Sequence, residues 1–175
     1  MASSYTGLGV ELMVTGENAG TWGTKTNTNL NILEQISGGF KSQAVNGTGA
    51  TTLTVTDGGT GATLATRSIK LTGTITGNIT VTIPLDVENF YFIENGTTGA
   101  YTVEFKYATG SGTSVTWAAT NKGFKIVNAK ADDGTNPNIT EIALATSPAG
   151  TTGQVQVNAS GAFGAVSEGT SGFVL

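Results

Sequence analysis

Residues 79–107, ITVTIPLDVENFYFIENGTTGAYTVEFKY, decide the fold class of this chain. In residues 79–83 and 101–107, branched or aromatic apolar residues alternate with threonine and charged residues, which is the two-residue period of half-buried strands. Residues 90–93 are apolar on both faces and predict a more central strand. The dipeptide Asn95-Gly96 favours a tight turn with positive φ, so we expect residues 90–93 and 101–107 to form a β-hairpin.

The same alternation extends outward in both directions. It recurs in residues 52–56, 68–72, 114–117, 123–127 and 139–144, between clusters of glycine, asparagine and aspartate. Strands separated by roughly 8 to 12 residues are typical of a sandwich or small barrel. We therefore expect a mainly β chain, an antiparallel β-sandwich or small barrel with one short N-terminal helix and an extended C-terminal arm.

Residues 16–39, GENAGTWGTKTNTNLNILEQISGG, differ from the rest of the chain because they carry a helical pattern. Trp22 stands among glycines in an expected loop, and Asn27, Thr28 and Asn29 are candidate N-caps for a short helix. Gly38 and Gly39 are expected to end that helix through a left-handed position. The expected packing face of the helix consists of Leu30, Leu33 and Ile36.

Trp22 permits two interpretations at this point. A tryptophan in a polar loop either packs over its own domain or anchors in the pocket of a partner, since tryptophan is enriched at interface hot spots. The pattern also divides the chain into three parts. We expect an N-terminal docking arm, Trp loop and helix in residues 1–39, an antiparallel β domain in 40–146 and an extended Gly/Ala/Ser-rich arm in 147–175.

The composition excludes several functions. The chain has no cysteine and no histidine, which removes disulfides, the usual zinc ligands and the side chain that titrates near neutrality, so we do not expect an enzyme or a cofactor. A net charge of -4 with 11% charged residues argues against binding nucleic acid. No apolar run approaches about 20 residues, and the N-terminus lacks the pattern of a signal peptide, so we expect no membrane span.

Three clusters have both a functional and a structural interpretation. Residues 132–138, DDGTNPN, could supply oxygen ligands to calcium, but a surface turn explains them without the EF-hand pattern. Residues 58–63, GGTGAT, lack the lysine of a phosphate-binding loop and favour a hairpin tip. An aromatic group could form a sugar-binding platform or pack in the core; it consists of Tyr101, Phe105, Tyr107 and Trp117.

Several segments resemble a known family. Residues 10–12 (VEL), 15–23 (TGENAGTWG), 26–30 (TNTNL) and 33–38 (LEQISG) resemble the N-terminal module of bacteriophage tail-fibre and other tail-associated structural proteins, especially of marine phages. The resemblance continues in residues 71–84 (LTGTITGNITVTIP) and 92–99 (FIENGTTG). Residues 154–158 (QVQVN) and 160–164 (SGAFG) are similar to a short motif found where fibre shafts begin.

The resemblance implies a virion structural protein, made in the host cytoplasm, that assembles as a homotrimer and docks on a tail or adaptor protein. It supplies no catalytic residues. The chain stops soon after the second motif, which favours an anchor, adaptor or short fibre over direct host recognition. Two alternatives stay open: a capsid decoration (cement) protein, and an attachment module that binds host-surface glycan. The candidate interface residues are Trp22, Asn27, Asn29, Leu30, Leu33, Ile36 and Phe163.

Overall fold

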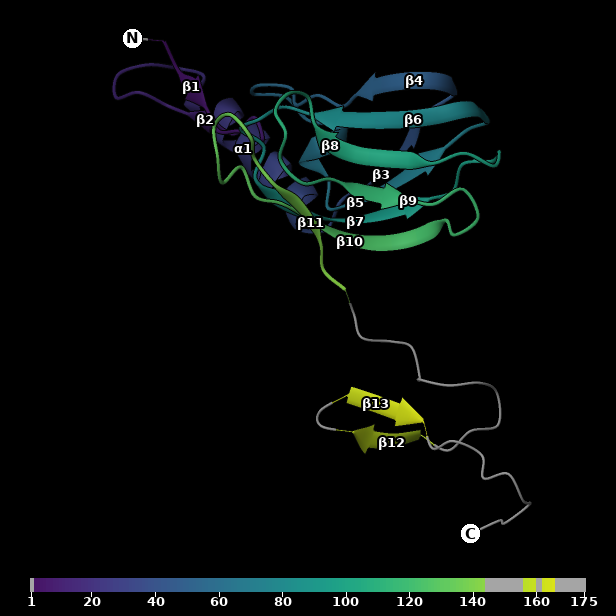
Figure 1. Cartoon of the computed structure of the whole chain (residues 1–175). Helices are drawn as coiled ribbons and strands as arrows, with labels where there is room; N and C mark the ends of the chain where they lie inside the picture. Colours follow the sequence, from purple (N-terminus) through teal and green to yellow (C-terminus); the bar gives the residue numbers. More distant parts are fainter. Residues whose placement is uncertain (1, 144–155, 160–161, 166–175) are drawn as a thin grey trace, which may run out of the picture. The chain divides into compact units, whose positions relative to one another are not determined.

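The computed structural model describes residues 2–143, 156–159 and 162–165 of this chain. The chain divides into two compact units, Met1–Ala143 and Leu144–Leu175. The first unit holds an α-helix and two larger β-sheets (Figure 1). These observations confirm a mainly β fold with one α-helix in the part of the chain that is described.

The body of the first unit alternates between two sheets. Its first six strands are β3 (Phe40–Ala44), β4 (Gly47–Thr52), β5 (Ser68–Thr72), β6 (Ile75–Ile83), β7 (Asn89–Asn95) and β8 (Val103–Tyr107). The odd-numbered strands pair in parallel in one sheet, and the even-numbered strands pair in parallel in the other. Each odd strand and the even strand that follows it therefore form one coil, and three coils stack side by side. A short 3-10 helix, η1 (Thr63–Ala65), lies between β4 and β5.

Antiparallel strands complete both sheets. Strand β9 (Val115–Trp117) pairs with β8 in one sheet. In the other sheet, β10 (Gly123–Ala129) pairs with β7, and β11 (Ile139–Glu141) pairs with β10. The sheet orders are β11-β10-β7-β5-β3 and β4-β6-β8-β9. Neither sheet closes on itself among the described strands, so the small-barrel alternative is wrong, and the expectation of wholly antiparallel pairing is wrong as well.

The predicted hairpin at Asn95-Gly96 is also wrong. The N–H of Gly96 donates to the carbonyl of Leu71 at 2.9 Å, so the chain still follows β5 after β7 ends. The side-chain oxygen of Asn95 accepts from the N–H and the hydroxyl of Thr97 at 3.1 and 2.7 Å. The positive φ occurs later, at Gly99 (104°), where an added Cβ would lie 2.2 Å from the carbonyl oxygen of Ile75. This corner carries the chain into the other sheet instead of back along β7.

The two sheets share one apolar core, to which the inward side chains of both contribute. It includes Ile69, Leu71, Tyr91 and Ile93 from the five-stranded sheet and Val81, Ile83, Val103, Phe105 and Trp117 from the four-stranded sheet. The polar atoms of its large aromatic side chains are satisfied, as buried polar groups require. The Tyr91 hydroxyl donates to the Leu64 carbonyl at 3.0 Å, and the Trp117 Nε1–H donates to the Gly123 carbonyl at 2.9 Å. The core interpretation is therefore confirmed for Phe105, Tyr107 and Trp117, which are buried, and is wrong for Tyr101, which is 38% exposed.

Helix α1 (Trp22–Gly38) is longer than expected, and it begins at Trp22 rather than after Asn27–Asn29. Asn18 adopts a φ of 62°, and its carbonyl accepts from the N–H groups of Thr21 and Trp22, which turns the chain into the helix early. The helix does not end through a left-handed glycine. Gly39 is extended, at φ -67° and ψ 151°, and an added Cβ there would lie 2.7 Å from the carbonyl oxygen of Gln35. Glycine is needed at this position for close approach to the last turn.

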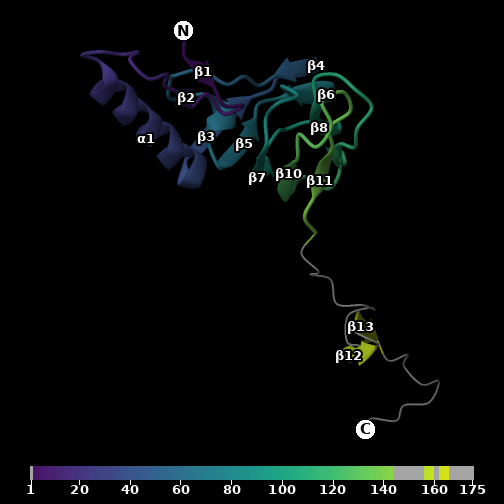
Figure 2. The same ribbon diagram turned by 90° about the vertical axis from the view of Figure 1, so that its left-hand side faces the viewer.

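A short antiparallel pair precedes the helix, formed by β1 (Ser4–Tyr5) and β2 (Glu11–Leu12). Figure 2 shows α1 beside the edge strand β3, with β1 and β2 on the same side of the body. In the second unit, β12 (Gln156–Ala159) and β13 (Ala162–Ala165) pair antiparallel. The remainder of the predicted C-terminal arm lies outside the described residues. No helix in the part described is long and apolar enough to cross a membrane.

Candidate interaction surfaces

The carboxylate of Glu11 connects the N-terminal arm to α1. Its oxygens accept from Ser3 Oγ at 2.7 Å, from Asn18 Nδ2 at 3.2 Å and from Lys25 Nζ at 2.9 Å. The hydrogen bond from Ser3 is the largest cause that holds the pKa of Glu11 below its usual value, and the hydrogen bond from Lys25 is the next. Lys25 has a raised pKa because of the same contact. Both groups are thus charged at neutral pH, and they fix β2 against the helix.

Asn29 supports the same junction through the backbone of Glu11. The N–H of Glu11 donates to Asn29 Oδ1 at 2.9 Å, and Asn29 Nδ2 donates to the carbonyl of Glu11 at 2.9 Å. This two-bond arrangement resembles one step of a β-ladder made by a side chain. Asn29, a predicted interface residue, therefore uses its amide within the chain, whereas Asn27 is exposed.

The apolar residues of α1 divide into a covered and an uncovered group. Ile32 is fully buried and Ile36 is partly buried, and they hold the helix on the body. Trp22, Leu30 and Leu33 are 66%, 57% and 49% exposed. Their spacing of eight and three residues places these three on one side of the helix. Trp22 therefore does not pack over its own domain, and the exposed face of α1 defined by these three residues presents a large apolar surface.

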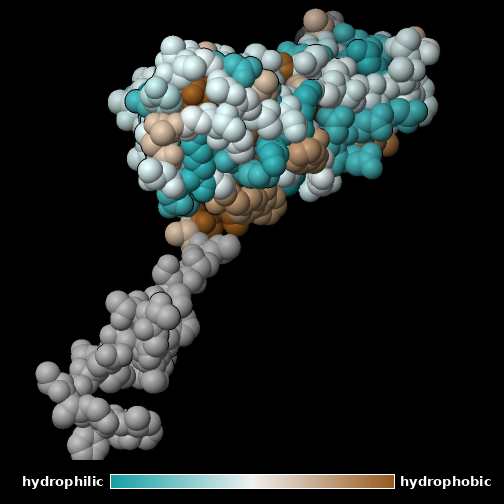
Figure 3. All heavy atoms as spheres, turned by 90° about the vertical axis from the view of Figure 1, so that its right-hand side faces the viewer, coloured by the Kyte–Doolittle hydropathy of each residue, from teal (hydrophilic) through white to brown (hydrophobic). Residues whose placement is uncertain are grey.

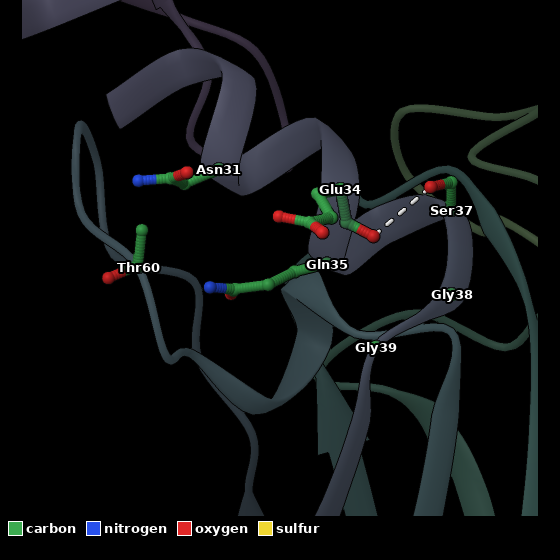
Figure 4. Close-up of a pocket in the computed structure, with 7 residues that line it drawn as sticks. All are labelled: Asn31, Glu34, Gln35, Ser37, Gly38, Gly39 and Thr60. Carbon is green, nitrogen blue, oxygen red and sulfur yellow. Dashed lines mark hydrogen bonds between the residues drawn. The ribbon is translucent and has the colours of Figure 1, made fainter. Parts of the chain in front are cut away.

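A cavity of about 520 Å³ lies beside the C-terminal half of α1 (Figure 4). Asn31, Glu34 and Gln35 line it from the helix, and Thr60 lines it from the loop after β4. Gln35 Oε1 accepts from the N–H of Gly61 at 3.0 Å, which fixes this loop against the helix. The loop joins strands of different sheets, so the hairpin tip expected for residues 58–63 is wrong. No group of three or more acidic, histidine or cysteine side chains that could hold a metal occurs among the described residues.

The outer surface of the five-stranded sheet carries an aromatic group that was not predicted from the sequence. Phe92 stacks with Phe124, with ring centroids 5.8 Å apart, and contacts the edge of Phe90 at the same distance. The guanidinium of Arg67 lies 3.9 Å from the centroid of Phe90. Phe40 shares their side of the sheet, because Phe40 pairs with Ser68 and Ser68 pairs with Phe92. These four phenylalanines form the aromatic face. The sequence feature that indicated it was the segment 90–93, which is apolar on both faces.

Apolar side chains are distributed unevenly over the surface. The face shown in Figure 3 is white or teal over most of its area, which marks intermediate or hydrophilic residues, and its largest apolar group lies at the lower margin. The outward side of the four-stranded sheet is polar, with Thr80, Glu104, Lys106 and Thr116 at alternate strand positions. The two sheets therefore differ in the surface that they offer to a partner.

The acidic loop between β10 and β11 satisfies its own carboxylates. Asp133 Oδ1 accepts from the N–H groups of Thr135 and Asn136 at 2.7 and 3.0 Å. Asp132 Oδ1 accepts from the N–H of Asn138 at 2.8 Å. These backbone hydrogen bonds lower the pKa of both aspartates. The surface-turn interpretation accounts for this loop without an ion.

Phe163, the remaining predicted interface residue, lies in β13 opposite Asn158, and its side chain lies outside what the structure describes. The described residues thus offer two candidate interaction surfaces, which are the exposed face of α1 and the aromatic face. Comparison with known proteins adds no relative, since no family model, curated protein or solved structure matches this chain.

Proposed function

We propose that this chain is a structural component of a phage virion, a tail fibre or fibre-anchoring adaptor that acts by assembly and docks to the tail. The observation that carries the proposal is the exposed face of α1, where Trp22, Leu30 and Leu33 are uncovered. Large apolar side chains grouped on a surface are characteristic of protein interaction sites, and tryptophan is enriched among the residues that dominate their binding energy. The sequence resemblance to tail-associated proteins supplies the class of partner.

The attachment of α1 to the arm supports a docking role. Two contacts fasten the N-terminal half of the helix to β2: the ion pair of Lys25 with Glu11, and two hydrogen bonds between the Asn29 side chain and the backbone of Glu11. A surface that is already ordered loses less conformational entropy on binding. Trp22 and Leu30 are therefore presented on a fixed support.

The aromatic face supports assembly of several copies. Phe40, Phe90 and Phe124 are exposed on it, and Arg67 at its edge is paired with an aromatic ring. We propose that this face is covered in a homotrimer, because closed symmetric assembly buries the same patch on every copy. We interpret the two larger sheets, which share one core, as the layers of a sandwich with parallel coils.

Particle assembly tests the docking role directly. We expect the double variant Trp22→Ala, Leu30→Ala to fold and to be depleted from purified phage particles, because both side chains are exposed and contribute little to the fold. The matched control is Thr24→Ala, Asn31→Ala, which changes two exposed polar residues of the same helix. Equal incorporation of both double variants would contradict the docking role.

Labelling of intact particles tests the location. Gold-labelled antibody against the chain is expected at the tail. Label distributed over the head would instead favour the capsid-decoration alternative.

A further inference from the structure

A groove of about 420 Å³ separates the N-terminal arm from α1. Leu8 and Val10 line it from the arm, and Leu33 and Ile36 line it from the helix. Asp86 and Glu88, from the loop between β6 and β7, line its third side. Three segments that are distant in the sequence thus form one apolar groove with two carboxylates at its border.

The arm is held at a fixed distance from this loop, so the groove exists before any partner binds. An added Cβ at Gly7 would lie 2.1 Å from the carbonyl oxygen of Asp86, which shows how closely the two backbones approach. The carbonyl of Gly9 accepts from the N–H of Gly58 at 2.8 Å. The N–H of Gly9 donates to the carbonyl of Thr6 at 2.8 Å, closing a tight turn in the arm. A preformed, mainly apolar groove with a few polar groups is the usual form of a recognition site.

The charge at the border of the groove has one sign. Asp86 and Glu88 are exposed, and neither takes part in the ion pairs of the described residues. The lysine of α1, Lys25, is bound to Glu11 and does not line the groove. In a chain of net charge -4, no residue that lines this groove neutralises the two carboxylates. A ligand that complements the groove therefore has an apolar part and a positive charge.

We infer that the groove binds an extended segment of another virion protein in which apolar residues stand next to lysine or arginine. The inference rests on the proposed function and specifies the chemistry of the partner. Apolar side chains of that segment would contact Leu8, Leu33 and Ile36, and the cation would pair with Asp86 or Glu88. An exposed ion pair changes affinity by only a few-fold, but it also selects against acidic partners and speeds association.

Synthetic peptides test the groove on the full chain. The probe is a fluorescent peptide of alternating leucine and lysine, compared with one in which glutamate replaces lysine and one in which serine replaces leucine. We expect measurable binding by anisotropy for the leucine–lysine peptide alone, with methyl NMR shifts at Leu8, Leu33 and Ile36. Equal binding of the leucine–glutamate peptide, or an absence of shifts at these methyl groups, would overturn the inference.

Matched variants separate the groove from the rest of α1. We expect the double variant Asp86→Asn, Glu88→Gln to weaken binding of the leucine–lysine peptide several-fold at low salt, whereas Glu34→Gln, at an exposed glutamate of α1, leaves it unchanged. Leu33→Ala is expected to weaken binding more than Leu30→Ala. If either pair shows no difference, the groove is not the binding site.

Particle incorporation distinguishes this inference from the proposed function. Depletion of the Trp22→Ala, Leu30→Ala variant together with normal incorporation of an Asp86→Asn, Glu88→Gln variant would reject the groove and retain the docking role. Normal incorporation of both would reject the docking role itself. We expect both to be depleted.

Discussion

Lys25 Nζ lies 2.9 Å from a carboxylate oxygen of Glu11, and this contact joins the arm to the helix. The Glu11 side chain is 3% exposed, whereas that of Lys25 is 35% exposed. The carboxylate is therefore surrounded by hydrogen-bond donors from three segments, and the cation closes the site on its outer side. Because the exposed face of α1 belongs to the same helix, the charge of Glu11 influences how that face is held.

Acid is expected to loosen the arm. The pKa of Glu11 is lowered from its ordinary value of 4.5 in the folded chain, so the carboxylate contributes its full stabilisation above that pH. This contribution is lost as the pH falls through the lowered pKa. We expect hydrogen exchange at the Glu11 amide, which is bonded to Asn29, to accelerate in that range after correction for the intrinsic rate. A Glu11→Gln variant is the control, and the same acceleration in that variant would show that other groups, such as Asp132 and Asp133, are responsible.

Core and surface phenylalanines are expected to respond differently. Phe105 is fully buried, so Phe105→Ala should lower the free energy of unfolding by about 3–5 kcal/mol. Phe124 is 58% exposed and stacks on Phe92, so Phe124→Ala should lower it by only about 1 kcal/mol at concentrations where the chain is monomeric. Chemical denaturation measures both values. Sedimentation velocity should show weaker self-association for Phe124→Ala, and unchanged association would remove the aromatic face as the surface between copies.

Gly7 is expected to tolerate no side chain. A Cβ at this position would lie 2.1 Å from a backbone oxygen, so Gly7→Ala must displace the arm from the loop that carries Asp86. We expect a lower melting temperature and faster exchange at the Gly58 amide, which donates to Gly9. Gly23→Ala is the control: this helical position is open, and alanine there should stabilise by up to about 1 kcal/mol. A melting temperature unchanged by Gly7→Ala would show that the arm does not pack as described.

The Asn95-Gly96 bond is expected to resist deamidation in the folded chain. Deamidation requires attack of the glycine nitrogen on the asparagine side chain, and the N–H of Gly96 is engaged with the carbonyl of Leu71 at 2.9 Å. Asn46-Gly47 is protected in the same way, since the N–H of Gly47 donates to Thr74 at 3.0 Å. Peptide mapping after incubation at mildly alkaline pH should show deamidation of both bonds in urea and little in buffer. Equal rates in the two solvents would contradict the parallel ladder at these corners.

The sequence predicted strands well because alternation reveals which residues face the core. Val103, Phe105 and Tyr107 alternate with polar residues, and all three are buried. Alternation does not identify the neighbouring strand, which is why parallel coils were mistaken for hairpins. A signal for the coils was present in the tripeptide Asn-Gly-Thr, which occurs at residues 46–48 and again at 95–97. Both copies lie where the chain crosses from the five-stranded to the four-stranded sheet.

The interaction surfaces were predicted only in part. The spacing of apolar residues on α1 identified Leu30 and Leu33. It did not reveal that both are exposed and that Ile32 is the fully buried residue of the helix. Prediction of the groove would have required knowledge of long-range contacts. Its walls come from residues 6–10, 33–36 and 86–88, and contacts between such distant segments leave no periodic pattern in a single sequence.

The stacked coils also make the body divisible along its axis. Each coil is bonded to its immediate neighbours, so an additional copy of the β5–β6 coil would meet the same ladder partners on both sides. Such a duplication would increase the separation between the helix-bearing edge and the closing strands by about 4.8 Å, the spacing of neighbouring strands. The number of coils would then set the length of the body, while the surfaces at its two ends would stay the same.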